Sequence, residues 1–421
     1  MKRLLLTLAL TALVAPGVAM AHAILLDTSP ANHASVRRSP RDVRVTFDDS
    51  VRLGHGNAAV ANDTGESILS GPPVVVGHSV VLPLRPDLPN GDYSARWSIV
   101  AEDGHRQQGV LAFAVGAASG SPTSVLGASA PLSWTDVALR ALYLAGALTA
   151  AGVFSFWLLV RRLFVEDLRR HISRLLFFAL LAAFVGAGGL EHTATGGTRF
   201  ALFAKVAAIV AAGGAAAAAL AASRTNLLPA AGLGAVALVI APAFGGHALD
   251  HGSPAWVAVP VDLLHLGSAA VWIGGLVALL SLLRGAVGDA AVRVAAARRF
   301  STVALAAVVV LAASGLGRAL TELDSVSQIW STSYGRALIV KTVLFLPLLG
   351  VGRANRAVLA HASARLARPV LIELAVLAAI VGVVGVLTDL RPGSEAPHKS
   401  PSSIAAYSRP VVPASASSRR R

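Results

Sequence analysis

Residues 259–283 read VPVDLLHLGSAAVWIGGLVALLSLL, and Asp262 is the one charged side chain in this run. At a rise of 1.5 Å per residue, a helix of this length is about 37 Å long. The hydrocarbon core of a bilayer is about 30 Å thick. The run therefore predicts a membrane-spanning helix.

Similar apolar runs lie on both sides of this stretch. Together they predict a polytopic α-helical membrane domain of about eight spans. The runs are roughly 135–160, 174–190, 201–222, 227–244, 259–283, 302–320, 336–352 and 369–390. The whole 421-residue chain is 55% hydrophobic and 14% charged, with a mean hydropathy of +0.66. Soluble domains are about a quarter charged, so this composition excludes an ordinary soluble enzyme and a disordered chain.

The first 21 residues, MKRLLLTLALTALVAPGVAMA, have the three parts of a secretory signal peptide. A basic start precedes a short apolar run and a small-residue cleavage site that ends at Ala21. A short membrane anchor is the alternative, but the apolar run is shorter than a span. Cleavage would make His22 the N-terminal residue and remove Met1 and Met20. The chain has no cysteine, so the mature protein would contain no sulfur.

Residues 22–116 have a different character, because short β-rich runs such as 43–47 alternate there with Gly-, Pro- and Asn-rich turns. This pattern is typical of a small all-β domain, with an Ig-like or Greek-key sandwich. A linker rich in Ala, Ser and Gly, 117–132, separates it from the membrane domain, 133–390. The Ser-, Pro- and Arg-rich tail, 391–421, is expected to be disordered.

The formal net charge of +14 is unevenly distributed. The β domain has eight arginines against ten carboxylates, whereas alternate loops of the membrane domain carry fourteen arginines. Basic residues accumulate in cytoplasmic loops, and export by the signal peptide requires the same orientation. We expect a multi-pass protein of the bacterial inner membrane with a periplasmic N-terminal domain. The charge gives no reason to expect a nucleic-acid partner.

His22, Asp103 and His105 are the candidate metal ligands of the β domain. An N-terminal histidine offers its amino and ring nitrogens together, and Asp103-Gly104-His105 adds a carboxylate and a second imidazole. Nitrogen and oxygen ligands in a tetragonal arrangement suit Cu(II), and the loss of sulfur disfavours Cu(I). For Asp-Gly-His alone, a hairpin turn with a solvated histidine is the favoured alternative.

Candidate ligands of the membrane domain gather at its predicted outer end. They are His247 and His251 after the fourth span, Asp262 and His265 in the fifth, and His192 at the end of the second. Spacings of three and four residues place side chains on one helix face, and ionisable residues within membranes are often functional. For His192 and His251, an interfacial position without metal is the favoured alternative.

Two further charged residues, Lys341 and Glu373, lie within the seventh and eighth predicted spans. They could form a buried ion pair that fixes helix packing, or they could line a path for a cation. The pair Gly274-Gly275 is expected to be a close helix-packing surface rather than a site.

Four stretches of the β domain carry a family resemblance. They are HAILLDTSPA at 22–31, VRVTF at 43–47, GDYSARW at 91–97 and EDGHRQQGVLAF at 102–113. The domain resembles the periplasmic copper-binding family CopC over essentially all of 22–116. The resemblance implies that His22, Asp103 and His105 bind Cu(II). Some members also have a Met-rich Cu(I) site, and a chain without methionine would lack it.

The membrane domain carries a second resemblance. Its motifs are GHA at 246–248, DLLHLGSAAVWIGGL at 262–276, ARRFS at 297–301, SG at 314–315, YGRALIVK at 334–341 and NR at 355–356. They are similar to the copper-resistance membrane family CopD over about 133–390. The whole chain therefore resembles a CopC–CopD fusion, which implies copper transport across the inner membrane, copper homeostasis and copper resistance.

We expect a copper-binding and copper-transport protein rather than an enzyme. No lysine follows a glycine, so the chain has no Walker A loop, and the membrane potential favours cation entry. Copper ions and the lipid bilayer are the expected partners, and other periplasmic copper proteins are candidates. The alternatives are a haem- or copper-based membrane electron-transfer or reductase protein, and a copper-sequestering resistance protein without transport.

Overall fold

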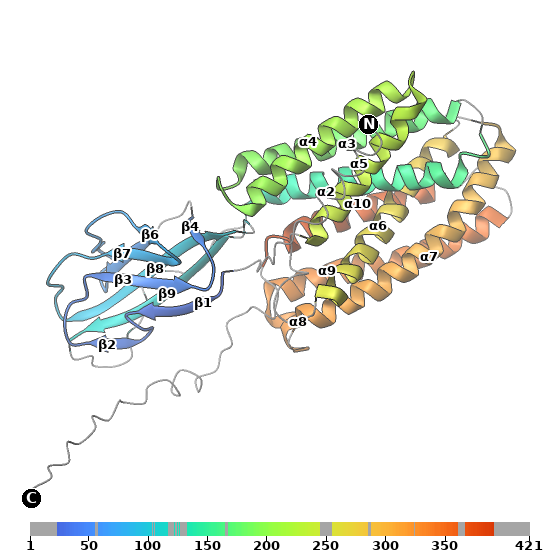
Figure 1. The fold of residues 1–421 in the computed structure, drawn as a ribbon. Helices are drawn as coiled ribbons and strands as arrows, with labels where there is room; N and C mark the ends of the chain where they lie inside the picture. Colours follow the sequence, from blue (N-terminus) through green and yellow to red (C-terminus); the bar gives the residue numbers. More distant parts are fainter. Residues whose placement is uncertain are drawn as a thin grey trace, which may run out of the picture.

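The computed structural model of the chain consists of a β domain and a bundle of long helices (Figure 1). It describes residues 23–54, 58–102, 104, 106–116, 122, 124, 126, 133–164, 167–244, 255–284, 288–323, 325–360 and 367–390. The predicted signal peptide, most of the predicted linker and the predicted tail lie outside these residues. The β domain lies at one end of the helical bundle (Figure 1).

Nine strands in the described part of the β domain form two sheets. They are β1 (Leu25–Ser29), β2 (Ala34–Val36), β3 (Asp42–Phe47), β4 (Val51–Leu53), β5 (Ala59–Asn62), β6 (Val74–Val76), β7 (Ser79–Pro83), β8 (Gly91–Ala101) and β9 (Arg106–Val115). One sheet has the order β1-β3-β7-β6, and the other β2-β9-β8-β4 with β5 also on β8. The β2–β9 pair is parallel, and the other pairs are antiparallel.

The core of this domain follows from the alternation of side chains along each strand. In β3, Val43, Val45 and Phe47 are buried, while Arg44 between them is exposed. The Phe47 ring meets that of Trp97 on the other sheet edge-to-face, with centroids 5.2 Å apart. Aromatic contacts between two facing sheets define a sandwich, so the predicted all-β sandwich is confirmed.

The second part of the chain is helical. Its elements are α2 (Trp134–Val160), α3 (Asp167–Thr193), α4 (Arg199–Ala221), the 3₁₀ turn η1 (Thr225–Leu227), α5 (Leu228–Ile240), the 3₁₀ turn η2 (Ala241–Phe244), α6 (Ala255–Leu283), α7 (Ala290–Glu322), α8 (Gln328–Ser331), α9 (Ser333–Ala360) and α10 (Ala367–Leu387). Seven of the described helices are long and apolar enough to cross a membrane. The predicted polytopic helical domain is thus confirmed.

The fourth predicted span, 227–244, differs from the others. It consists of the 13-residue α5 followed by the four-residue η2. Their combined rise is about 28 Å, close to the thickness of a bilayer core of about 30 Å. The Tyr143 hydroxyl on α2 donates to the Leu238 carbonyl at 2.8 Å, so this short segment is packed inside the bundle.

Three predicted spans were too short. The runs 174–190, 302–320 and 336–352 belong to α3, α7 and α9, which have 27, 33 and 28 residues. All three helices continue past the apolar run into segments that contain arginine, such as Arg169, Arg298 and Arg353. Arginine is a good helix former, so hydropathy gives the length of the apolar run and not that of the helix.

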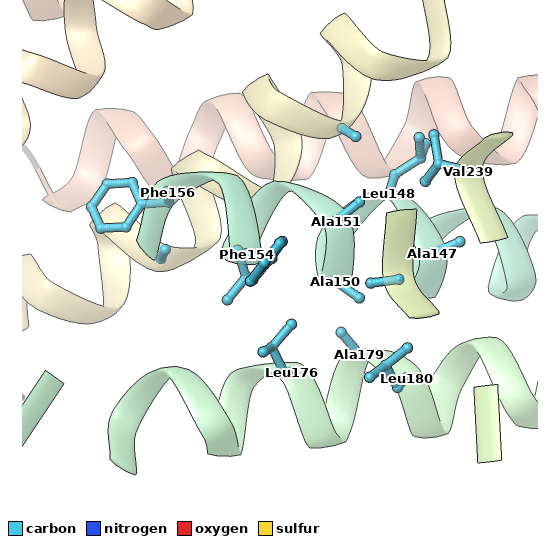
Figure 2. Close-up of a cluster of buried hydrophobic side chains, with 14 of the residues drawn as sticks. Ala147, Leu148, Ala150, Ala151, Phe154, Phe156, Leu176, Ala179, Leu180 and Val239 are labelled. Carbon is cyan, nitrogen blue, oxygen red and sulfur yellow. The ribbon is translucent and has the colours of Figure 1, made fainter. Parts of the chain in front are cut away.

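Helix α2 lies at the centre of the bundle and packs against α3, α5, α6 and α10. Figure 2 shows alanines of α2 between Phe154 and Leu148, facing Leu176 and Leu180 of α3. A Cβ added to Gly274 of α6 would lie 2.4 Å from the Thr149 carbonyl oxygen of α2. The predicted role of Gly274-Gly275 in close packing is therefore confirmed.

The helix connections fall into two groups. The end of the bundle next to the β domain is formed by the starts of α2, α4, α6 and α9 and the ends of α3, α7 and α10 (Figure 1). The opposite end holds the described helix ends that carry arginines predicted for one side, such as Arg161 and Arg169. There Arg169 donates to the Ala222 carbonyl at 3.3 Å, and the guanidinium of Arg161 lies 5.2 Å from the Trp157 ring centroid.

Candidate functional site

The three predicted ligands of the β domain, His22, Asp103 and His105, lie outside the described residues. The segments next to them meet at one end of the sandwich. The Ile24 amide donates to Asp48 Oδ1 at 2.6 Å, just after β3 ends. Three residues later, Val51 of β4 pairs with Ala101 at the end of β8. The fold therefore brings the chain before Ile24 and the β8–β9 loop to the same end of the domain.

The β8–β9 loop also contacts the helical bundle. Glu102 Oε2 accepts a hydrogen bond from the Arg199 amide at 3.2 Å, and the Glu102 carbonyl accepts one from the Phe200 amide at 3.1 Å. Arg199 and Phe200 are the first two residues of α4, whose amides have no acceptor within the helix. The carboxylate of Glu102 thus caps α4 at its positive end.

Two neighbouring contacts hold the loop in place. Gly104 has φ +82°, and a Cβ there would lie 2.6 Å from the Phe200 ring. Only glycine combines this backbone angle with so close an approach. On β4, Arg52 Nη2 donates to the Gly197 carbonyl at 2.9 Å in the α3–α4 connection. The loop between Asp103 and His105 is therefore seated directly on the start of α4.

A second set of contacts joins the β domain to α2. Arg106, the first residue of β9, lies 3.6 Å from the Asp136 carboxylate in the first turn of α2. One turn later, Arg140 pairs with Asp389 at 3.0 Å and places its guanidinium 5.5 Å from the Phe200 ring centroid. The β8–β9 connection is thus fixed to α4 and α2, and Arg140 in turn joins α2 to Asp389, just after α10.

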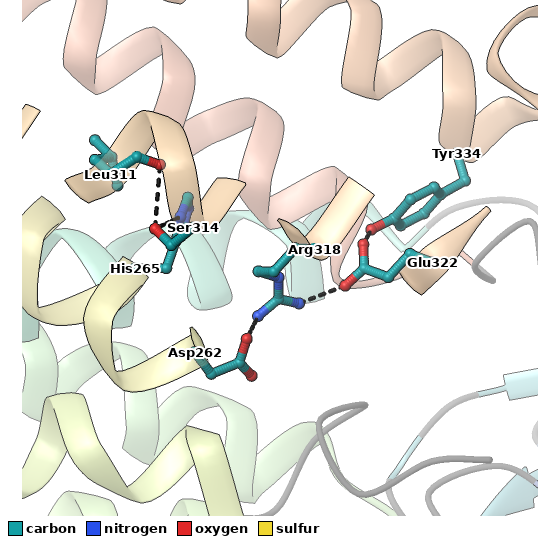
Figure 3. A network of polar contacts seen from close by, with 7 residues as sticks. All are labelled: Asp262, His265, Leu311, Ser314, Arg318, Glu322 and Tyr334. Atoms are coloured by element: carbon teal, nitrogen blue, oxygen red, sulfur yellow. Dashed lines mark hydrogen bonds and ion pairs between the residues drawn. The ribbon is translucent and has the colours of Figure 1, made fainter. Parts of the chain in front are cut away.

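The helical bundle holds a polar network below this contact region, on α6, α7 and α9 (Figure 3). Arg318 of α7 forms an ion pair with Asp262 of α6 and a second with Glu322 at 2.5 Å. Tyr334 of α9 donates its hydroxyl proton to Glu322. Asp262 is 7% exposed, and charges in such positions need partners, which this network supplies.

His265 lies one turn after Asp262 on the same face of α6 (Figure 3). Its Nδ1 lies 3.1 Å from Ser314 Oγ on α7. The predicted proximity of Asp262 and His265 is therefore present. Their polar partners differ, however, because the carboxylate is paired with Arg318 and the imidazole with a hydroxyl.

Of the other candidates of the membrane domain, the structure describes His192 alone. His247 and His251 lie outside the described residues. His192 is exposed in the last turn of α3. The described side chains include no group of three or more that could hold a metal ion.

Lys341 and Glu373 occupy different surroundings. Glu373 is 3% exposed and accepts a hydrogen bond from Asn355 of α9. Lys341 is close enough to Arg318 and Glu322 to interact with their charges. Within the described part of the chain, no ion pair connects Lys341 with Glu373. The two residues therefore belong to separate polar groups on α9 and α10.

Sequence reasoning missed the roles of five residues that the structure makes prominent. Arg318 and Glu322 have the four-residue spacing of a helical ion pair, which was a usable signal. The hydroxyls of Ser314 and Tyr334 gave no such signal, because their roles depend on contacts between helices. Glu102 was quoted only as part of a motif, and its capping of α4 depends on how the domains meet.

Comparisons with known proteins agree with both parts of the chain. The CopC domain family model matches residues 25–116, and the Copper resistance protein D family model matches residues 294–387. The chain is 29% identical over 371 residues to Copper transport protein CutJ of Bacillus subtilis, covering 80% of this chain and 68% of that protein.

Shorter matches cover each part separately. The chain is 32% identical over 108 residues to Protein YobA of Escherichia coli, covering 25% of this chain and 86% of that protein. It is 31% identical over 189 residues to Copper resistance protein D of Pseudomonas syringae, covering 41% and 61%. Among solved structures, CopC from Methylosinus trichosporium matches with a TM-score of 0.21 and 25% identity, covering 25% of this chain and 100% of that one.

Proposed function

The chain belongs to the CopC–CopD family of copper transport and resistance proteins, and from this premise we propose that it moves copper inward across the bacterial inner membrane. In this proposal the β domain is periplasmic and captures Cu(II) with His22, Asp103 and His105. It then passes copper to the membrane domain at His247 and His265. The inside-negative potential supplies about 2.3 kcal/mol per charge per 100 mV for entry.

The first step is supported by the ligands that the sequence offers. An amino nitrogen, two imidazoles and a carboxylate are the nitrogen and oxygen donors that suit Cu(II). The Ile24–Asp48 and Val51–Ala101 contacts bring the flanking segments of these ligands to one end of the sandwich. A chain that has lost both methionines with the signal peptide would have no thioether for a separate Cu(I) site.

The contact between Glu102 and the start of α4 is the main support for the proposed transfer of copper from the β domain to the membrane domain. It joins Glu102, the residue before Asp103 in the sequence, to the end of the bundle at which α6 begins. Copper released from the β8–β9 loop would therefore enter the protein at the end where Asp262 and His265 lie. An isolated metal-storage domain would have no need of such a contact.

The proposed orientation is supported by the distribution of charge. The arginine-rich connections are grouped at the end of the bundle away from the β domain. Basic residues favour the cytoplasmic side. In this orientation the β domain faces the periplasm, and the outer ligands face the copper source.

Purified full-length protein in sealed vesicles, with a copper-sensitive dye inside, tests the transport step. We expect dye quenching that is faster with an inside-negative potential, and a loss of quenching in His265→Gln. The matched control is His78→Ala, which changes an exposed histidine of the β domain. Equal quenching in protein-free vesicles would contradict transport and favour sequestration. A Soret band in the purified protein would favour the haem alternative.

Binding of Cu(II) to the full-length protein tests the capture step separately. His22→Ala removes both the ring and the favourable geometry at the new N-terminus, so we expect the affinity to fall by at least tenfold. His78→Ala should bind like the wild type. Unchanged tight binding in His22→Ala would show that the β domain uses other ligands.

A further inference from the structure

Ser314 hydrogen-bonds to His265 in a way that decides which ring nitrogen carries the proton. The Ser314 hydroxyl lies 2.6 Å from the Val310 carbonyl oxygen and 3.2 Å from the Leu311 carbonyl oxygen. A serine hydroxyl has one proton to donate. That proton goes to a carbonyl of α7, so the oxygen presents a lone pair to His265 Nδ1 at 3.1 Å.

His265 Nδ1 must therefore donate to Ser314. The ring rests against Gly315, where an added Cβ would lie 3.2 Å from Cε1 and 3.6 Å from Nδ1. Leu311, Ser314 and Gly315 lie on one face of α7. Together they fix both the orientation and the tautomer of the imidazole.

We propose that His265 Nε2 is the atom that accepts copper in the membrane domain, and that Ser314 is its positioning residue; this rests on the proposed function. With the proton on Nδ1, Nε2 has a lone pair. In the part of the chain that the structure describes, the hydrogen bond of this ring to Ser314 is made through Nδ1 and leaves Nε2 outside that contact. His265 is partly exposed, so the nitrogen is not sealed inside the core. Metal-binding histidines commonly have the other ring nitrogen held by an oxygen acceptor.

The same geometry gives Asp262 a structural role instead of the role of a metal ligand. Its carboxylate is held by Arg318, which also holds Glu322 (Figure 3). Asp262 thus joins α6 to α7 and fixes the turn from which His265 projects. Copper could use this carboxylate only by displacing a guanidinium that is paired with two acids.

The charges around His265 suit a site that releases its ion. Asp262 and Glu322 balance Arg318 and Lys341, and Lys341 is close enough to Glu322 to interact with its charge. These four described side chains together leave no net negative charge to trap a cation. Conduction requires sites that bind weakly enough for the ion to leave. A neutral imidazole in balanced surroundings meets that requirement.

The experiment uses full-length protein in nanodiscs with ¹⁵N-labelled histidine. Two-bond ¹H–¹⁵N spectra distinguish the two tautomers, and His265→Gln identifies the resonance. We expect the Nδ1–H form in the wild type, and a mixture of forms in Ser314→Ala. Ser314→Thr keeps the hydroxyl and should restore the Nδ1–H form. Ser301→Ala on the same helix is the matched control, with no change expected.

Titration of the same samples with Cu(II) tests acceptance of the metal. We expect selective broadening of the His265 signal in the wild type, and about tenfold more Cu(II) for the same effect in Ser314→Ala. An Nε2–H tautomer in the wild type, or no broadening, would overturn the inference. Broadening in a protein that moves no copper into vesicles would instead refute the proposed transport and leave the assignment of Nε2 standing.

Discussion

The β domain and the helical bundle place charged and apolar side chains in opposite ways. In the β domain, the Arg85–Glu66 ion pair is on the surface, with both side chains more than half exposed. In the bundle, Phe178 is 65% exposed, whereas Asp262 and Glu373 are 7% and 3% exposed. One domain therefore suits water, and the other suits a surrounding of lipid.

This difference changes what an ion pair contributes to stability. A surface pair exchanges contacts with water for contacts with its partner, and the net gain is about 0–1 kcal/mol. A buried pair that loses one partner leaves a charge without water or a counter-charge, which costs about 3–5 kcal/mol. The comparison between the two domains therefore predicts which substitutions reduce the stability most and which reduce it least.

The largest expected effect is at Arg318. Arg318→Met removes the only side chain found to pair with both Asp262 and Glu322 in the described network. The carboxylates of Asp262, which is buried, and Glu322, which is partly buried, would then lose the guanidinium that they share. We expect a loss of about 3–5 kcal/mol, measured as unfolding of the full chain in detergent by the loss of its helical circular dichroism.

A triple variant separates charge from packing at this position. Asp262→Asn, Arg318→Met and Glu322→Gln together remove all three charges and keep an acceptor for Tyr334. Most of the lost stability should return, because no carboxylate of this network is left without its guanidinium partner. A triple variant as unstable as Arg318→Met would show that the guanidinium acts through its shape, and the contrast between the two domains would weaken.

The next effect concerns the close contact between α2 and α6. A methyl group at Gly274 would lie 2.4 Å from a backbone oxygen and 2.6 Å from Gly152 Cα. Since backbone cannot move aside easily, Gly274→Ala should cost about 1–3 kcal/mol in the same unfolding measurement. Gly267→Ala lies on the same helix with no atom within 4 Å. It should be neutral or stabilising by up to about 1 kcal/mol.

The two glycine variants also test whether close packing of helices stabilises the bundle, as a hydrophobic core stabilises the β domain. The β domain joins its sheets through large rings such as Phe47 and Trp97, whereas α2 meets α6 through glycine. Equal results for Gly274→Ala and Gly267→Ala would mean that the helices can shift apart freely. The close approach would then contribute little to the fold.

The third effect is at the joint between the domains. Glu102→Ala removes the acceptor of the Arg199 amide at the start of α4. Loss of a cap costs about 0.5–2 kcal/mol, so we expect faster hydrogen exchange at Arg199 and little change inside the sandwich. Glu66→Ala is the matched control, since it removes a glutamate of the same domain that faces water. Unchanged exchange at Arg199 in Glu102→Ala would show that the domains are held without this cap.

Much of the fold could be predicted from the sequence because hydropathy and strand alternation are local signals. The sandwich followed from runs such as Val43 to Phe47, and the spans followed from apolar stretches. The ends of α3 and the division of 227–244 into α5 and η2 were not predictable in this way. They depend on arginine-rich turns and on packing against α2, which hydropathy does not report.

The candidate site was predictable only in part. The spacing of Asp262 and His265 placed both on one face of α6, as the structure shows. Their partners come from α7, more than 45 positions later in the chain. No sequence period connects such distant residues. The carboxylate and the imidazole looked equivalent as ligands until Arg318 and Ser314 distinguished them.

The smallest expected effect is at the exposed pair of the β domain. Arg85 Nη1 lies 3.0 Å from Glu66 Oε1, with the two side chains 53% and 63% exposed. Arg85→Met matches the substitution proposed at Arg318 atom for atom, yet here water solvates the remaining carboxylate. The change should be about 0–1 kcal/mol and should shrink further at high salt. A loss of stability as large as that of Arg318→Met would mean that burial does not determine how much these ion pairs contribute to the free energy of unfolding. A small loss at Arg85 beside a large one at Arg318 would tie the difference to the surroundings of the same side chain.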